Sequence, residues 1–377
     1  MKMLVMVVFL LYFFSLIYPD SERYIYNNEL FAILGLSVIV IPSIAKKIIT
    51  KKLYPLFLFV MYGLFLLFFS IPQIAKTGLY LSIRTMPVWY SVFAFFLGAY
   101  CLNKFSTKEI MLISNKLRKV SWIGLFITPF KLSPQVIFSL SIGGKFIPFF
   151  FFMLLFFLVK PALTTITGML VGAAFLFWMK SKEAKILTRK KFIISASVLL
   201  FLSIYFMKPI LDKFLIVGYD GFSGDNNATW RLMFWTYLFN EKFLQSPFYG
   251  IGFGAPLFDI YNAPKFITSD DGSRLTEYTL GAHNSFFYTG IRMGGVGLIL
   301  LIWSTVSIYS YAAKCIKKIR QTPAEGVLIS IILANLMFLN AAFFNVIMES
   351  PLYASNYWFT LGLMYSFAKR IHRDTAS

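Results

Sequence analysis

Long apolar runs separated by short polar stretches dominate this chain. Each run can form a helix that crosses a hydrocarbon core of about 30 Å. The stretch 120–179 is also apolar but contains four prolines, and it fits either two long tilted spans or four shorter pieces. The pattern therefore predicts an all-α polytopic integral membrane protein with about 10 to 12 transmembrane helices. The clearest predicted spans are residues 3–18, 29–45, 53–71, 86–103, 192–211, 286–313, 324–345 and 353–368.

The composition excludes most other classes of protein. Hydrophobic residues make up 58% of the 377 positions and charged residues only 14%, whereas soluble domains carry about 25% charged residues. This balance excludes soluble enzymes, disordered chains and disulfide scaffolds. Met1-Lys2 and the apolar run 3–18 resemble a signal sequence, but no small-residue cleavage site follows, so we expect a retained first span.

The positive charge indicates orientation rather than nucleic-acid binding. The formal net charge is +20, but the basic residues gather in short clusters between the apolar runs, which is typical of cytoplasmic loops. Placing all the clusters inside puts both termini in the cytoplasm. Cys101 and Cys315 then lie near cytoplasmic ends, where we expect no disulfide. The clusters fall within residues 46–52, 104–119, 180–191, 314–320 and 369–373.

One long polar segment, residues 212–283, is predicted to lie outside as a large periplasmic loop. It carries 8 of the 16 acidic residues and 5 of the 36 basic ones, a net charge of −3. A loop of this length is usually functional. It separates an N-terminal transmembrane bundle, 1–211, from C-terminal transmembrane helices and a short tail, 284–377. Within it, the aromatic stretch 230–239 predicts a short helix on the membrane surface, with N-cap candidates at 226–229.

Few residues are candidates for chemistry. His283, at the outer start of a span, can act as a general base near neutral pH, although Asn284 and Ser285 could simply cap a helix there. Arg292 lies two turns deeper, where a cation is either functional or snorkels to the interface. Arg231 opens the predicted surface helix, at the depth of lipid phosphates. The other histidine, His372, is expected to be solvated in the cytoplasmic tail.

Two further motifs have simpler interpretations. The stretch 250–254 (Gly-Ile-Gly-Phe-Gly) lacks the Lys-Ser/Thr of a nucleotide loop, and it predicts a tight backbone turn. Asp270-Asp271 lacks further spaced ligands and is expected to be solvated rather than a metal site. No zinc-type spacing of Cys and His appears.

In order along the chain, these pieces resemble the O-antigen ligase/polymerase superfamily of membrane glycosyltransferases. The shared pattern is an Arg opening an amphipathic segment (Arg231), then Pro-x-x-Gly-x-Gly-x-Gly (247–254), then His-Asn (His283-Asn284) before a glycine-rich span. The likeness covers about residues 225–300. The family often carries a Ser-Arg pair before an earlier span, and the stretch 160–168 lacks that Arg. Lys160 is the candidate replacement, which requires it to lie outside and favours the larger span count.

The resemblance implies an inverting, metal-independent glycosyl transfer in the bacterial inner membrane, with the active site facing the periplasm and no cofactor. Its substrates would be undecaprenyl-diphosphate-linked oligosaccharides, as donor and acceptor. His283 would be the base, and Arg231, with Arg292 or Lys160, would bind the diphosphate. Asn284, Gly252 and Gly254 complete the implied site. Membrane lipids and a chain-length regulator protein are further expected partners, and nucleic acid is not.

Several functions remain open at this point. A polymerase would join lipid-linked repeat units into O-antigen or a related surface polysaccharide, and a ligase would transfer the finished chain to lipid A core. Both need the same base and diphosphate clamp, and the Lys/Ile/Phe-rich composition favours the polymerase. A lipid-linked oligosaccharide flippase is the alternative from another class, but transporters often show internal repeats, which this chain lacks. A structural scaffold would leave His283 and Arg231 replaceable.

Overall fold

The computed structural model describes residues 29–40, 50–103, 105–106, 109–110, 112, 136, 139, 145–159, 163–183, 227–259 and 281–374. Every regular element in these ranges is helical, which confirms the predicted all-α membrane fold. The predicted spans 3–18 and 192–211 lie outside the described residues. The helices are α2 (Glu29–Val40), α4 (Tyr54–Phe69), α5 (Ile71–Thr77), α6 (Leu79–Arg84), α7 (Pro87–Tyr90), α8 (Phe93–Leu102), α11 (Phe146–Val159), α12 (Leu163–Glu183), α14 (Asn227–Leu238), α16 (Ser285–Ile316), α17 (Pro323–Phe344) and α18 (Pro351–Asp374), with short turns η1 (Lys51–Leu53) and η2 (Phe239–Phe243).

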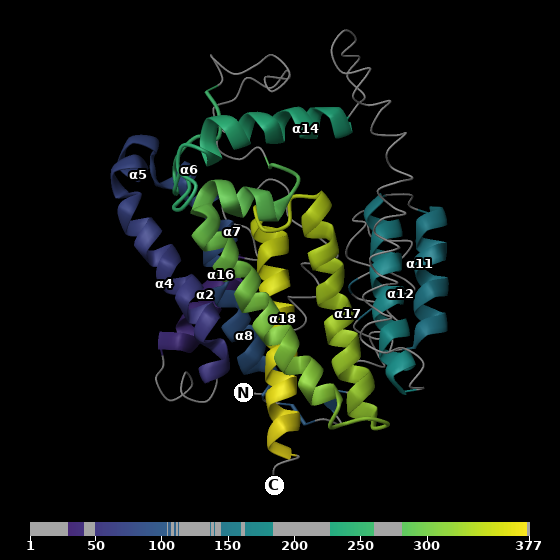
Figure 1. Ribbon diagram of the computed structural model, residues 1–377. Coiled ribbons are helices and arrows are strands. Elements are labelled where there is room, and N and C mark those ends of the chain that lie inside the picture. Colours follow the sequence, from purple (N-terminus) through teal and green to yellow (C-terminus); the bar gives the residue numbers. More distant parts are fainter. Residues whose placement is uncertain are drawn as a thin grey trace.

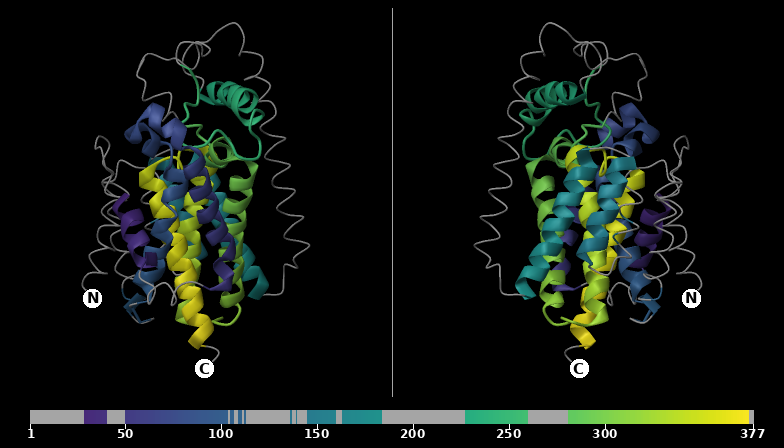
Figure 2. Two further views of the ribbon diagram at one scale, coloured as in Figure 1. Left: turned by 90° about the vertical axis from the view of Figure 1, so that its left-hand side faces the viewer. Right: turned by 90° about the vertical axis from the view of Figure 1, so that its right-hand side faces the viewer.

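The long helices stand side by side in one bundle, and α14 lies across one end of it (Figures 1 and 2). We call this the outer end. Helix α16 begins there, and the described basic residues 317–320 and 369–373 lie at the opposite end (Figure 1). This distribution matches the predicted topology, in which the basic clusters share one side of the membrane.

Three helical stretches in the described part of the chain have the length and apolar composition to cross a membrane: 51–69, 285–316 and 323–344. Shorter apolar helices cover 29–40, 87–102, 147–156 and 164–179. The predicted span 86–103 forms two consecutive helices, α7 and α8, rather than one. In the stretch 120–179, α11 and α12 lie side by side, and the total number of spans stays a prediction.

Helix α18 is the central element of the bundle. Nearly every described side chain from Ala354 to Ala368 is buried against α8, α16 and α17. Its contact with α8 is close enough that a Cβ on Gly362 would lie 2.0 Å from the carbonyl oxygen of Phe95. Small residues permit such backbone approach between membrane helices. Protein rather than lipid surrounds α18, and the buried Thr360 hydroxyl is satisfied within the helix by the Asn356 carbonyl at 2.8 Å.

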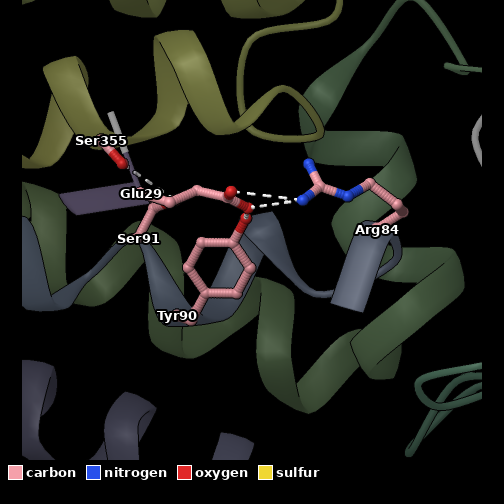
Figure 3. Close-up of polar contacts among 5 residues, drawn as sticks. All are labelled: Glu29, Arg84, Tyr90, Ser91 and Ser355. Carbon is pink, nitrogen blue, oxygen red and sulfur yellow. Dashed lines mark hydrogen bonds and ion pairs between the residues drawn. The ribbon is translucent and has the colours of Figure 1, made fainter. Parts of the chain in front are cut away.

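A buried ion pair holds the outer ends of the first helices together. Arg84 at the end of α6 donates to the carboxylate of Glu29 in the first turn of α2, with an N···O distance of 3.2 Å. The hydroxyl of Tyr90 donates to the same carboxylate (Figure 3). Glu29 also suits the positive end of the α2 dipole. The pair fixes the position of Thr85, which follows Arg84 and contacts the loop described next.

Candidate active site at the outer end

Helix α16 is broken at Gly294, where φ is 66° and ψ is −178°. The break interrupts the helical hydrogen bonds on both of its sides, and it leaves backbone donors and acceptors without their usual partners. At membrane depth such groups are tolerated only where protein or a polar cavity satisfies them. A partner segment must therefore cover the break.

The loop 247–254 is that partner. The amides of Ile251 and Gly252 donate to the carbonyls of Ile291 and Arg292 at 2.9 and 3.0 Å. The Gly295 amide donates to the Pro247 carbonyl at 2.7 Å. The hydroxyl of Tyr62, on α4, donates to the carbonyl of Met293 at 2.9 Å. The Pro-x-x-Gly-x-Gly-x-Gly motif thus satisfies the backbone groups that the helix break exposes. This explains why the motif occurs together with a glycine-rich span.

The approach of the two backbones requires glycine. Gly250 has φ +69°, and a Cβ there would lie 2.5 Å from the Gly294 nitrogen. A Cβ on Gly294 would lie 2.2 Å from the Phe248 carbonyl oxygen. Both contacts are with backbone atoms, which cannot rotate away as a side chain would. Gly250 and Gly294 therefore form a fixed crossing point between the loop and α16.

The far side of the same loop is tied to the segment that follows α4. Ser70 accepts from the Phe253 amide at 2.9 Å, and Thr85 accepts from the Gly254 amide at 2.8 Å. The amides of Gly252 and Gly254 are therefore both bonded to protein acceptors. These two predicted substrate-binding residues shape the loop, and any direct contact with substrate stays a prediction.

Helix α14 covers the start of α16 through a second apolar cluster, separate from the main core. A helix is observed at Asn227–Leu238, three residues before the start of the predicted stretch 230–239, so the N-cap candidates 227–229 lie within it, and a π-turn at Phe239–Phe243 follows. Such turns are frequent at functional sites. The position of α14 on the membrane surface stays a prediction. The buried members of the cluster are Phe234, Leu238, Leu257, Phe258, Ala282, Tyr288 and Ile291.

Two side chains of α14 bond to backbone carbonyls beneath it. Arg231 donates to the Phe344 carbonyl at the end of α17, at 2.8 Å. The indole N–H of Trp235 donates to the carbonyl of Ala282. Helix α14 is therefore joined both to α17 and to the residue that precedes His283.

His283 lies immediately under α14. Its ring meets the ring of Trp230 edge-on, with centroids 5.9 Å apart and planes at 86°. Its Nδ1 atom is buried and has no hydrogen-bond partner. Burial first, and the charge of Arg231 second, lower the pKa of His283 to about 4. The imidazole is therefore neutral at pH 7, the form that accepts a proton. The structure brings the two predicted catalytic residues, His283 and Arg231, together.

Arg292 is fully buried within the protein, so it does not snorkel. Its Nε donates to the Tyr288 hydroxyl at 3.0 Å, and its Nη1 donates to the carbonyl of Ala255. The guanidinium also lies over the Tyr288 ring. Arg292 thus fixes the loop after Gly254 to α16 and adds positive charge below the site. Direct contact between Arg292 and the substrate remains a prediction.

Asn284 and Ser285 have structural roles. The Asn284 side chain caps α16 by accepting from the Phe287 amide at 3.0 Å. The buried Ser285 hydroxyl accepts from the amides of Ile347 and Met348 at 3.0 and 2.9 Å, and it also contacts the Glu349 carboxylate. The capping alternative is therefore correct for Asn284, whereas Ser285 ties the start of α16 to the segment between α17 and α18. A sugar contact by Asn284 stays a prediction.

Glu349 and Lys242 are two charged residues that sequence reasoning did not assign to the site. Burial raises the pKa of Glu349 to about 7, and its second carboxylate oxygen has no hydrogen-bond partner. Burial and then the charge of Arg292 lower the pKa of Lys242, which lies in η2. The sequence did contain a signal for Glu349, because it is an acidic residue between two predicted spans. For Lys242 no sequence signal separated it from other loop lysines.

The remaining candidates lie elsewhere. His372 lies at the opposite end of the bundle, where its Nδ1 is 2.9 Å from the amine of Lys318. Lys160, Asp270 and Asp271 are outside the described residues. Helix α12, which follows Lys160, begins near the outer end, because Asn340 of α17 donates to the Thr164 carbonyl at 2.9 Å. In the part of the chain that the structure describes, no three His, Cys, Asp or Glu residues are grouped to hold a metal, and Cys101 and Cys315 are buried free thiols.

A comparison with known protein families matches part of the chain. The fold is that of an integral membrane protein, and at its outer end a neutral histidine lies under α14, the helix that carries Arg231. Residues 148–302 match the family model described as O-antigen ligase. This match supports the O-antigen ligase/polymerase superfamily, and the matched stretch contains every predicted site residue, from Lys160 to Arg292. No curated protein matches the chain.

Proposed function

We propose that the protein is a membrane glycosyltransferase that polymerises undecaprenyl-diphosphate-linked oligosaccharide repeat units on the periplasmic face of the inner membrane. The observation that carries this proposal is the juxtaposition of a neutral, half-buried His283, whose Nδ1 atom is buried, with the cation Arg231. A base and an anion-binding cation are what transfer from a diphosphate-linked sugar requires. The family match over 148–302 supports the reaction class.

In the proposed step, a hydroxyl of the acceptor unit attacks the anomeric carbon of the donor sugar. His283 takes the hydroxyl proton as the new glycosidic bond forms. The bond from the anomeric carbon to the diphosphate oxygen breaks with its electron pair, and the polyprenyl diphosphate leaves. A single displacement inverts the anomeric configuration, and His283 then passes its proton to water.

Arg231 and the surrounding charge act on the leaving group. The guanidinium bonds the diphosphate and stabilises the negative charge that develops on it. Arg292 and Lys242 add positive potential from below and beside the site. Because Arg231 lowers the pKa of His283, a bound diphosphate that offsets this charge raises that pKa. Binding of the donor therefore makes the histidine a stronger base at the moment it is needed.

A reaction with purified full-length protein in detergent tests this function. The natural lipid-diphosphate-linked repeat unit is supplied alone, and in a second reaction together with lipid A core. Products are then separated by mass. A ladder of lengthening lipid-linked oligosaccharides supports the polymerase. His283→Ala should abolish the ladder, whereas His372→Ala, at the other end of the bundle, should not.

The second candidate is a ligase, which the description of the matched family favours. Sugar transferred to lipid A core without a ladder would replace the polymerase proposal with this one. No product in either reaction, from folded protein with its natural repeat unit, would contradict both and favour a flippase.

A further inference from the structure

The residue that holds the base has an unusual backbone conformation. His283 has φ +52°, a region that residues other than glycine rarely adopt. Such a conformation is strained and persists only where neighbouring contacts impose it. At a site residue, this strain calls for an identifiable restraint.

Two contacts restrain the residues on either side of His283. On one side, Asn284 is held as the N-cap of α16. On the other, the Ala282 carbonyl accepts a hydrogen bond from the Trp235 indole, and Ala282 itself is fully buried. Gly281 is wedged against Val346, since a Cβ on it would lie 2.2 Å from that side chain. The Trp235 bond is the restraint that comes from the covering helix.

The indole ring is itself firmly placed. Trp235 packs in the second apolar cluster, with its ring 6.2 Å from that of Phe287. One turn earlier on α14 lie Trp230, which meets the His283 ring edge-on, and Arg231, whose charge acts on it. Helix α14 therefore contacts the His283 ring through Trp230, lowers its pKa through Arg231 and holds the backbone before it through Trp235.

We propose that Trp235 is a positioning residue for the base: by holding the Ala282 carbonyl, it keeps the His283 ring against Trp230 and Arg231 in the geometry that the reaction needs. This role rests on the proposed function only in naming His283 as the base. Without the indole N–H, the backbone at His283 relaxes toward negative φ and the ring moves. A displacement of about 1 Å at a reacting group can cost about 100-fold in rate.

Trp235→Phe removes the N–H and keeps an aromatic ring. Tyr309→Phe is the matched control, because it also removes a donor and keeps the ring: the Tyr309 hydroxyl donates to the side-chain oxygen of Asn335 at 2.8 Å, towards the opposite end of α16. Steady-state kinetics on the repeat unit should show kcat lowered about 10- to 100-fold by Trp235→Phe, with KM within about twofold. Tyr309→Phe should lower the melting temperature without this loss of kcat.

A second readout does not depend on turnover. The chain has two histidines, so isotope-labelled histidine in a His372→Ala background reports His283 alone by NMR. Trp235→Phe should shift this resonance and raise the pKa of His283 from about 4 towards 6.5, while Tyr309→Phe leaves both unchanged. An unshifted resonance overturns the proposal, even if activity falls. If the wild-type protein makes no product, the proposed function fails, but the NMR comparison still decides the role of Trp235.

Discussion

The crossing of loop 247–254 over α16 makes Gly250→Ala the sharpest structural test. The new Cβ would lie 2.5 Å from the Gly294 nitrogen and 2.6 Å from the Arg292 carbonyl carbon. Relief to an ordinary contact requires a shift of about 1 Å. The same shift would stretch the bonds from Ile251 and Gly252, now 2.9 and 3.0 Å, beyond hydrogen-bonding range. The substitution thus breaks two buried backbone bonds as well as straining φ.

The free-energy cost follows from these losses. A non-glycine residue at positive φ costs about 1 kcal/mol, and each buried backbone bond left unmade costs about 1–2 kcal/mol. The sum is about 3–5 kcal/mol, which corresponds to a fall of roughly 4–6 °C in melting temperature for a chain of 377 residues. Thermal unfolding of the purified protein in detergent, followed by intrinsic fluorescence, measures it.

Two other glycines serve as controls for this measurement. Gly78 also has positive φ, +91°, but a Cβ there meets nothing within 4 Å, so Gly78→Ala isolates the conformational strain. Gly290 is helical, and its nearest contact is an ordinary 3.7 Å, so Gly290→Ala should be neutral or slightly stabilising. If Gly250→Ala melts at the same temperature as Gly78→Ala, the close-approach argument is wrong.

Three further predictions concern the groups around the base. Arg231→Gln should raise the pKa of His283 above about 4, measured by histidine NMR, because it removes the charge that opposes protonation; an unchanged pKa would contradict the contact. Glu349→Gln should raise the melting temperature relative to wild type at pH 8 but not at pH 4.5. The folded pKa of about 7 exceeds the ordinary 4.5, so wild-type stability is lost as pH rises between these values, and equal differences at both pH values would refute this. Ser285→Ala should destabilise the protein by about 2–4 kcal/mol, because the buried amides of Ile347 and Met348 lose their acceptor, and a melting temperature within 1–2 °C of wild type would refute this.

The spans were predictable because lipid imposes a simple requirement on the residues that face it. The predicted 324–345 and 53–71 closely match α17 and α4. The predicted 353–368 underestimates α18, which continues to Asp374 through a basic last turn. Packing against neighbouring helices, rather than contact with lipid, determines the length of α18, since protein surrounds it. Packing also splits the predicted span 86–103 into α7 and α8, a division that hydropathy alone does not reveal.

The residue types of the site were predictable, but several of their roles were not. His283 and Arg231 stood out because histidine and arginine are rare where a span meets the outer surface of the membrane. The structure brings the two side chains together. Arg292 also stood out, yet its guanidinium is bonded to Tyr288 and Ala255 inside the protein. Partners contributed by distant segments decide such roles. The contribution of Trp235 depends on a contact across 47 positions, which no local pattern contains.

The break in α16 and the covering helix α14 together position the base and satisfy the buried backbone around it. The base must be held in a fixed position, and the buried backbone around it must have its polar groups satisfied. The break at Gly294 leaves backbone groups for the glycine loop, which in turn carries the Ala255 carbonyl to Arg292. The start of the same helix presents His283 to α14. One continuous element, α16, therefore joins the loop, the buried cation and the base, so a change at Gly250 should alter the environment of His283 without touching it.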